Sequence, residues 1–216
     1  MNPDKGILIV HEGRGESQSL NRLAAKTGRS LPDFASTFVR FLPSQRIPIT
    51  NSADAVRAAK IGFRYRPDAI LLTADLDDDC PRDKAPEWAA AVRELRLPVP
   101  VALVLFYREY ETLAVSCAGS LAGRELVPGL ILNPRVLPEV DPESRRDAKG
   151  WISHNLMNGT RYKPTVHQLP LTALMRVEDL RASGLSSFRR FERALQFLAQ
   201  EVRTGRTGVY PSTGRM

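Results

Sequence analysis

The sequence is poor in residues that form disulfides or bind soft metals. It contains two cysteines, Cys80 and Cys117, and three histidines that are scattered along the chain. A disulfide framework or a structural zinc site needs several such residues at close, regular spacing. We therefore expect neither, and a reducing cytoplasm is the environment that this cysteine content favours.

Long apolar runs are absent as well, and so is one familiar nucleotide-binding loop. No run approaches the ~20 residues that a membrane-spanning helix needs, so we expect no membrane association. The first apolar run, residues 6–10, is too short for a secretory signal. The chain also lacks the pattern G-x-x-x-x-G-K-[ST], so it carries no ATPase loop of this type.

What is present is a normal globular composition with an uneven distribution of charge. Hydrophobic residues make up 43% and charged residues 25% of the 216 positions, enough for one α/β domain with an appendage or for two small domains. Residues 144–216 hold 13 Lys and Arg against 5 Asp and Glu, whereas residues 1–143 hold 18 against 19. A basic C-terminal segment is typical of phosphate contacts, but a solvated basic helix and tail explain the charge equally well.

Short apolar runs alternate with helical patterns over the first 120 residues. Buried strands are predicted at residues 6–12 and 68–75, and residues 99–111 predict a strand that runs into a helix near Glu109. Residues 38–50 contain two prolines and suit an edge strand. Helices are predicted at 16–28, 53–65, 84–95 and 112–123.

The ends of two predicted helices carry recognisable signals. Gly28 is expected to stop the first helix, and Asn51 or Ser52 to cap the second. Alternating strands and helices favour an α/β fold with a mostly parallel sheet flanked by helices. Ligands of such folds bind beyond the carboxyl ends of the strands.

The composition also suggests how the chain is divided. Residues 1–123 are expected to form the α/β domain, and the proline-rich residues 124–146 a connecting segment. Residues 147–203 predict a helical region packed on that domain, and residues 204–216 a flexible tail.

Acidic side chains follow each of the three predicted buried strands. The candidates are Glu12 and Glu16, then Asp75, Asp77 and Asp79, then Glu109 and Glu111. The carboxyl ends of parallel strands meet at one edge of a sheet, so we expect these groups to converge. Carboxylates without histidine or thiolate suit Mg²⁺ or Mn²⁺, and a cluster of this size could hold two ions.

A polar loop is the alternative explanation for some of these aspartates. Asp79 or Asp83 could cap the helix that follows, and for Asp78 and Asp83 we prefer that interpretation.

Several of these motifs resemble one protein family. Glu-Gly at the end of the first strand and Asp-x-Asp at the end of a later one resemble the Toprim domain of topoisomerases, primases and OLD-type nucleases. The segments "IVHEGRGESQSL", "ADLDDDCP", "FYREYETLAVSCAGSLAG", "AKGWISHNLMNG" and "SSFRRFERAL" look like successive blocks of an uncharacterised bacterial Toprim-like family. The resemblance covers roughly residues 6–200. It implies a Toprim/Rossmann-like α/β fold with a C-terminal helical extension.

The resemblance also implies roles for individual residues. Glu12 would be a metal ligand or general acid/base, and Asp75 and Asp77 the magnesium-binding pair. The further acids would be Asp79 as an added ligand, Glu16 as the second acid of the first block, and Glu111 as part of a second metal site. Candidate nucleic-acid contacts are Lys149, Lys163, Arg161 and Arg14. Arg176 stands where the family has an acidic residue, which leaves the role of that region open.

Together these features predict a Mg²⁺-dependent endonuclease that acts on DNA or RNA. Members of the family are often encoded beside an ABC-, SMC- or AAA-like ATPase, in settings that suggest defence against phages, so an ATPase partner is expected. The alternative is a non-catalytic subunit that binds nucleic acid or an ATPase and has a vestigial or structural metal site.

Two other activities are disfavoured. A phosphatase of the haloacid dehalogenase type expects a nucleophilic aspartate on the first strand, which here ends in Glu12. A topoisomerase-type covalent step needs a tyrosine nucleophile, and the candidates Tyr107, Tyr110 and Tyr162 are better explained by packing.

Overall fold

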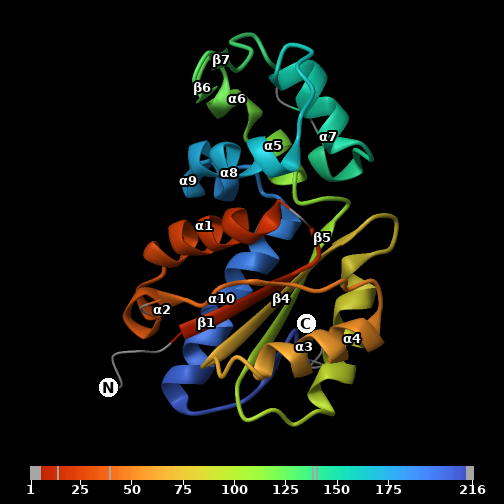
Figure 1. Ribbon diagram of the computed structural model, residues 1–216, viewed down its shortest axis with the longest axis vertical. Coiled ribbons are helices and arrows are strands. Elements are labelled where there is room, and N and C mark those ends of the chain that lie inside the picture. Colours follow the sequence, from red (N-terminus) through yellow and green to blue (C-terminus); the bar gives the residue numbers. More distant parts are fainter. Residues whose placement is uncertain (1–5, 14, 39, 138, 140, 213–216) are drawn as a thin grey trace.

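The computed structural model describes residues 6–13, 15–38, 40–137, 139 and 141–212. Figure 1 shows two parts stacked along the long axis: a base that contains the large sheet, and an upper lobe of short helices and a small hairpin. The chain leaves the base after the strand β5, builds the upper lobe with residues 108–185, and returns to the base in the helix α10.

A parallel sheet forms the centre of the base. Its long strands are β1 (Gly6–His11), β4 (Ala69–Leu76) and β5 (Val101–Tyr107), which confirm the three predicted buried strands. The short strands β2 (Arg40–Phe41) and β3 (Gln45–Arg46) both pair with β1 in the region predicted as an edge. The order is β2-β1-β4-β5-β8, and every pair is parallel. The carboxyl ends of β1, β4 and β5 therefore lie at one edge.

Helices cover both faces of this sheet, as predicted. One face carries α1 (Glu16–Arg29), α2 (Pro32–Thr37) and α10 (Ser186–Thr204), and the other carries α3 (Ser52–Phe63) and α4 (Pro81–Arg93). Alternate strand residues serve the two cores: Ile7 and Ile9 face one, and Leu8 and Val10 face the other. All four side chains are fully buried, which explains why the strand reads as a continuous apolar run.

The ends of the helices partly follow the sequence signals. Asn51 caps α3 by accepting a 2.9 Å hydrogen bond from the backbone N–H of Asp54, as predicted. Gly28 does not end α1, which continues to Arg29. A Cβ at Gly28 would lie 2.3 Å from the Phe34 ring, so this glycine permits close packing of α2. The predicted Asp79 or Asp83 cap of α4 is also wrong, because Cys80 holds the N-cap position without a side-chain hydrogen bond.

The upper lobe is made of short elements. In chain order they are α5 (Thr112–Ser116), α6 (Ala118–Leu121), β6 (Glu125–Val127), β7 (Leu130–Ile131), the 3₁₀ turn η1 (Pro142–Ser144), α7 (Ala148–Trp151), the π-helical turn η2 (Ile152–Leu156), α8 (Pro164–Leu174) and α9 (Val177–Ala182). The single helix predicted over 112–123 is broken at Cys117, and the connecting segment includes the antiparallel hairpin β6-β7.

Helix α10 packs on the sheet and forms part of the base. Its apolar stripe includes Phe188, Phe191, Leu195 and Leu198, all fully buried. The Phe191 ring lies 6.2 Å from that of Phe106 on β5. The domain boundary expected at residue 123 therefore separates segments that share one core.

The segment predicted as a flexible tail also joins the base. Residues Val209–Tyr210 form the strand β8, which pairs with β5. The backbone N–H of Gly208 donates to Glu201 at 2.7 Å, and Arg93 donates to the carbonyl of Val209 at 3.2 Å. Residues 213–216 lie outside the described part. Within the described residues, no helix combines the length and apolarity required for a membrane span.

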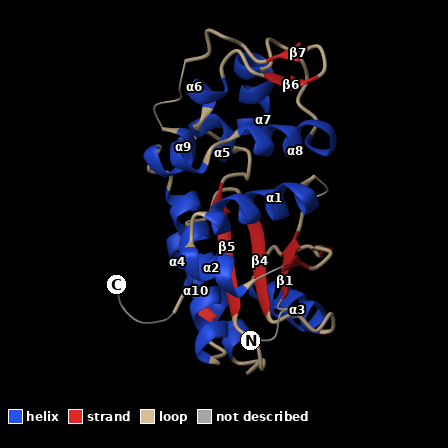
Figure 2. Ribbon diagram, turned by 90° about the vertical axis from the view of Figure 1, so that its left-hand side faces the viewer, coloured by secondary structure: helices blue, strands red, loops and turns tan. Residues whose placement is uncertain are grey.

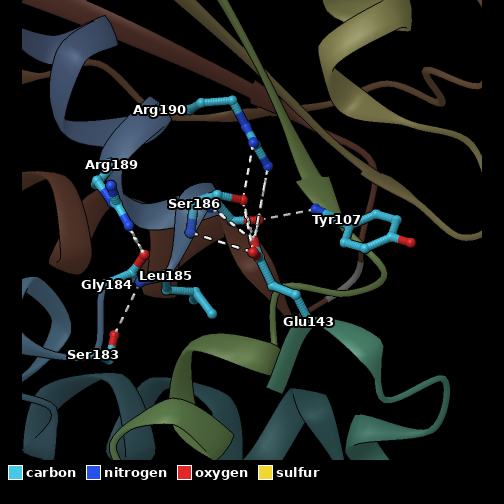
Figure 3. Close-up of polar contacts among 9 residues, drawn as sticks. Tyr107, Glu143, Ser183, Gly184, Leu185, Ser186, Arg189 and Arg190 are labelled. Carbon is cyan, nitrogen blue, oxygen red and sulfur yellow. Dashed lines mark hydrogen bonds and ion pairs between the residues drawn. The ribbon is translucent and has the colours of Figure 1, made fainter. Parts of the chain in front are cut away.

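Glu143 links the two chain segments that connect base and lobe, the end of β5 and the start of α10, as Figure 3 shows. Its carboxylate accepts hydrogen bonds from the hydroxyls of Ser186 (2.7 Å) and Ser187 (2.8 Å) and from the backbone N–H of Ser187 (2.9 Å). The hydroxyl of Ser187 in turn accepts from the N–H of Tyr107, at the end of β5. One side chain of the lobe thus joins the chain segments that leave and re-enter the base.

Candidate active site

The upper lobe adjoins the base at the end of the sheet where β5 leads into it (Figure 2). A pocket of about 510 Å³ lies at this carboxyl edge and is lined by residues of both parts. The base contributes Glu12, Gly13, Gly15, Glu16, Arg46, Pro48 and Asp75. The lobe contributes Glu111, Lys149, Pro164, Thr165 and Gln168. The acids that follow three separate strands therefore converge at one edge, as the sequence predicts.

Adjacent strands place Glu12 and Asp75 side by side. Glu12 follows the last residue of β1, and Asp75 is the penultimate residue of β4. The backbone N–H of Asp75 donates to Glu12 Oε1 at 3.3 Å, and the N–H of Tyr110 donates to Asp75 Oδ1 at 2.9 Å. Glu16, in the first turn of α1, is almost fully buried beside them.

Burial raises the pKa of every acid in this group, and the charge of at least one nearby carboxylate adds to the rise. Burial is the largest cause for Glu12, Glu16, Asp75 and Glu111. The charges of Glu111 and Glu12 add to it at Glu16, whose pKa reaches about 7. The charges of Glu16 and Glu111 help to hold the pKa of Asp75 well above its ordinary value. Ionising all four at neutral pH is therefore costly, and a divalent cation in the pocket would offset this cost.

Lys149 reaches into the pocket from α7 and pairs with two of the acids. Its Nζ donates to Glu109 Oε1 at 2.7 Å and lies 3.5 Å from Glu111 Oε2. Burial alone would lower the pKa of Lys149, but the two glutamates outweigh it and raise the pKa. Glu111 is 2% exposed, and its other oxygen accepts from the Tyr162 hydroxyl at 3.1 Å.

Asp77 and Asp79 do not line the pocket. Both are exposed, because β4 ends at Leu76 and the following residues turn towards solvent. The prediction that Asp77 shares a face with Asp75 requires the strand to continue for one more residue. The charge of Asp77 still raises the pKa of Glu12, so Asp77 lies near the rim. Asp78 pairs with Arg108 at 2.5 Å and with Arg146 at 2.9 Å.

The predicted basic contacts are divided between the pocket and its surroundings. Lys149 lines the pocket. Arg161 and Lys163 are exposed and precede the pocket-lining Pro164. Arg14 lies outside the described residues.

Sequence reasoning missed Gln168 and Arg46. Gln168 is buried on α8 and donates to Glu111 Oε1 at 3.4 Å, while its own Oε1 has no hydrogen-bond partner among the described residues. Arg46 donates to the backbone carbonyl of Glu12 at 3.0 Å. No local pattern marks either residue, because each reaches the pocket only through the packing of distant segments.

The donors in the pocket suit a hard cation. They are carboxylate and amide oxygens, the ligand types that Mg²⁺ and Mn²⁺ prefer. Within the described ranges, no three His, Cys, Asp or Glu side chains are arranged to hold one ion jointly. Mg²⁺ commonly keeps several waters and uses only one or two direct carboxylates, so Glu12 and Asp75 are sufficient as candidate protein ligands.

Comparisons with known proteins identify no relative. No protein-family model, curated protein or solved structure matches this chain.

A second pocket, of about 460 Å³, lies at the carboxyl ends of α1 and α8 and is lined by several cations. Lys26 donates to the carbonyl of Ala173 at 2.9 Å, and Arg124 to that of Leu174 at 2.9 Å. Cations at the last turn of a helix satisfy its free carbonyls and its dipole. Lys26 and Arg124 therefore have a structural role, which is to hold α8 of the lobe against α1 of the base.

Gly15 allows the lobe to approach the base at the pocket. A Cβ at this position would lie 2.8 Å from the carbonyl carbon and oxygen of Pro164 and 2.5 Å from Gln168 Oε1. Gly15→Ala is expected to lower the free energy of unfolding by about 1–3 kcal/mol, because the backbone of α8 must shift. Chemical denaturation measures this change. The control is Gln18→Ala, at an exposed position of α1, which should change the free energy of unfolding little. Equal stability of Gly15→Ala and wild type would contradict the close approach of α8 to Gly15.

Proposed function

We propose that this protein is a Mg²⁺-dependent nuclease of the Toprim type that hydrolyses phosphodiester bonds in DNA or RNA. The observation that carries the proposal is the convergence of Glu12, Glu16 and Asp75 with Glu111 in one pocket at the carboxyl edge of a parallel sheet. Their raised pKa values mark a site that is electrostatically unfavourable without a cation.

The residues of the pocket would have distinct tasks. Glu12 and Asp75 would hold the divalent ion, and a bound ion activates water and neutralises phosphate charge. The exposed Arg161 and Lys163, next to the rim, would bind the phosphates of the nucleic acid and position the chain. Hydrolysis by activated water needs no tyrosine nucleophile, and Tyr110 is fully buried with its hydroxyl 2.9 Å from that of Thr172.

The direct test is a cleavage assay with plasmid, single-stranded DNA and total tRNA. Each substrate is incubated with Mg²⁺, Mn²⁺ or EDTA, using wild type and Glu12→Ala. We expect cleavage of at least one substrate that depends on the divalent ion and is lost in the variant. Cleavage that persists in EDTA, or that is unchanged in Glu12→Ala, would rule out this active site.

We further propose that the nuclease is the cytoplasmic effector of an ATPase-linked anti-phage system. The support is the resemblance to a family encoded beside ABC-, SMC- or AAA-like ATPases. Low activity of the isolated protein, increased by the ATPase encoded next to it, is the expected result. Equal cleavage with and without that ATPase would contradict activation by a partner and would leave the nuclease proposal intact.

A non-catalytic binding subunit is the second candidate. It is favoured by the absence, within the described residues, of a closed three-ligand metal group and by the pairing of Glu111 with Lys149. The Asp75→Asn variant separates the two functions. If Asp75→Asn still binds nucleic acid or the ATPase and still supports defence against phages, the protein acts by binding alone.

A further inference from the structure

The carboxylates of the pocket form two groups, one in the lobe and one in the base, which differ in whether a lysine pairs with them. In the lobe half, Glu109 and Glu111 share Lys149. The two oxygens of Glu111 are both engaged, Oε1 by Tyr162 and Gln168 and Oε2 by Lys149. Glu111 would have to give up established partners before it could become a metal ligand.

The base half has no such compensation. In the described part of the chain, no lysine or arginine forms an ion pair with Glu12, Glu16 or Asp75. Glu12 and Asp75 accept only backbone N–H hydrogen bonds. His11 Nδ1 lies 3.9 Å from Glu16 Oε2 and 3.0 Å from the carbonyl oxygen of Gly13. Among the described residues these three carboxylates thus have no ion-pair partner of their own, although the charge of Lys149 lowers the pKa of each.

We propose that the pocket takes one divalent cation, in the half formed by Glu12, Glu16 and Asp75, and that Lys149 supplies the positive charge a second ion would otherwise provide. This inference rests on the proposed function and sharpens it, because the size of the cluster alone suggested room for two ions. Two-metal sites use the second ion to stabilise charge on the reacting phosphate. A lysine held by Glu109 and Glu111 places a fixed charge there without any metal.

The hydrogen-bonding capacity of Lys149 is consistent with this role. An ammonium group has three N–H donors: Glu109 accepts a hydrogen bond from one, and the ion pair with Glu111 Oε2 at 3.5 Å can engage a second. The third is left for a phosphate oxygen, which reconciles the observed ion pairs with the phosphate contact predicted from the sequence. Lys149 is 39% exposed at its side chain, so a ligand in the pocket can reach it.

The number of bound Mn²⁺ ions tests the proposal without measuring cleavage. Mn²⁺ is titrated into the metal-free full chain, and free Mn²⁺ is followed by electron paramagnetic resonance. Wild type is expected to bind one ion. Lys149→Met is expected to gain a second site beside Glu109 and Glu111, or to bind the first ion about tenfold more tightly, because a repelling positive charge has gone. Lys149→Arg keeps the charge and should restore the wild-type titration.

Two further variants guard against misfolding and unspecific effects. Lys149→Met leaves the buried Glu111 uncompensated, so the double variant Lys149→Met, Glu111→Gln removes both charges and should fold and bind one ion. Lys60→Met removes an exposed lysine of α3, outside the pocket, and should leave the titration unchanged. Two ions bound by wild type, or identical titrations of wild type and Lys149→Met, would overturn the inference while leaving a metal-dependent nuclease possible. No binding by wild type would overturn the proposed function as well.

Discussion

Replacing Asp75 by asparagine is expected to stabilise the metal-free protein and to abolish its activity. The change keeps the acceptor for the N–H of Tyr110 but removes a charge that Glu16 and Glu111 repel. We expect the free energy of unfolding at pH 7 to rise by about 1–3 kcal/mol, the usual order of the cost of a buried polar group without a compensating partner. Differential scanning calorimetry in EDTA measures this gain.

The pH dependence of that gain follows from the direction of the shift. The pKa of Asp75 is higher in the folded than in the unfolded chain, so its ionisation weakens the fold at pH values above the unfolded pKa. As the pH falls through the folded pKa towards about 4, the carboxyl group is protonated in both states and the penalty disappears. Wild type and Asp75→Asn should therefore converge in stability at acidic pH and diverge at neutral pH.

Magnesium should make wild type more stable than Asp75→Asn, the reverse of the order expected without the ion. An ion at 100 times its dissociation constant stabilises a folded protein by about 2.7 kcal/mol, and this increment should be present in wild type and lost in Asp75→Asn. Cleavage should fall about 1,000-fold, a loss of about 4 kcal/mol of transition-state stabilisation.

Asp79→Asn is the matched control for these measurements. It makes the same chemical change four residues away, at an exposed position outside the pocket. It should leave the magnesium increment and the cleavage rate unchanged. The reverse result, with Asp79 essential and Asp75 dispensable, would show that the carboxylates after β4 bind the ion and that the pocket does not.

The sequence predicts the site well where one strand end defines it. Glu12 and Asp75 adjoin apolar runs that are fully buried in parallel strands, so their convergence follows from strand order alone. Asp77 does not line the pocket for a local reason. Period-two alternation places it on the same face as Asp75 only if β4 extends beyond Leu76, and the chain bends there instead. Element ends are the least certain part of a pattern-based prediction.

The contribution of the lobe could not be predicted in the same way. Gln168 and Lys149 belong to segments without strand periodicity, and only the packing of α8 along α1 brings Gln168 to Glu111. Residues 147–203 are predicted to be helical and packed on the α/β domain, but the pattern does not say which surface of that domain the apolar stripe of α10 covers. Its burial against β5 needs the sheet to exist first, which is a tertiary effect.

Replacing Glu143 by alanine is expected to destabilise the fold by about 3 kcal/mol. The carboxylate accepts hydrogen bonds from four donors, the hydroxyl and the backbone N–H of both Ser186 and Ser187, at the first turn of α10. A hydrogen bond to a charged group contributes about 1.5–3 kcal/mol, and bonds within one network are not additive. Loss of the carboxylate also frees the connection between β5 and α10 that runs through Tyr107, so the position of the lobe should loosen. Urea denaturation measures the stability, and hydrogen exchange of the Tyr107 and Ser187 amides reports the loosening.

The charge of Glu143 makes this effect depend on pH. Although burial raises its pKa, the hydrogen bonds from Ser186 and Ser187 outweigh burial and hold the pKa below its ordinary value. A lowered folded pKa gives stability that is present above the unfolded pKa, about 4.3, and is lost as the pH falls through the folded pKa. The difference in the free energy of unfolding between wild type and Glu143→Gln should thus be full at pH 7 and shrink below about pH 4.

Glu139→Ala is the control: it removes a partly exposed ion pair with Arg145 in the same segment and should lower the free energy of unfolding by less than about 1 kcal/mol. Equal losses in the two alanine variants would show that Glu143 is an ordinary surface acid. A selective loss for Glu143, together with weaker binding of Mn²⁺, would mean that this contact holds the lobe in the position that completes the pocket.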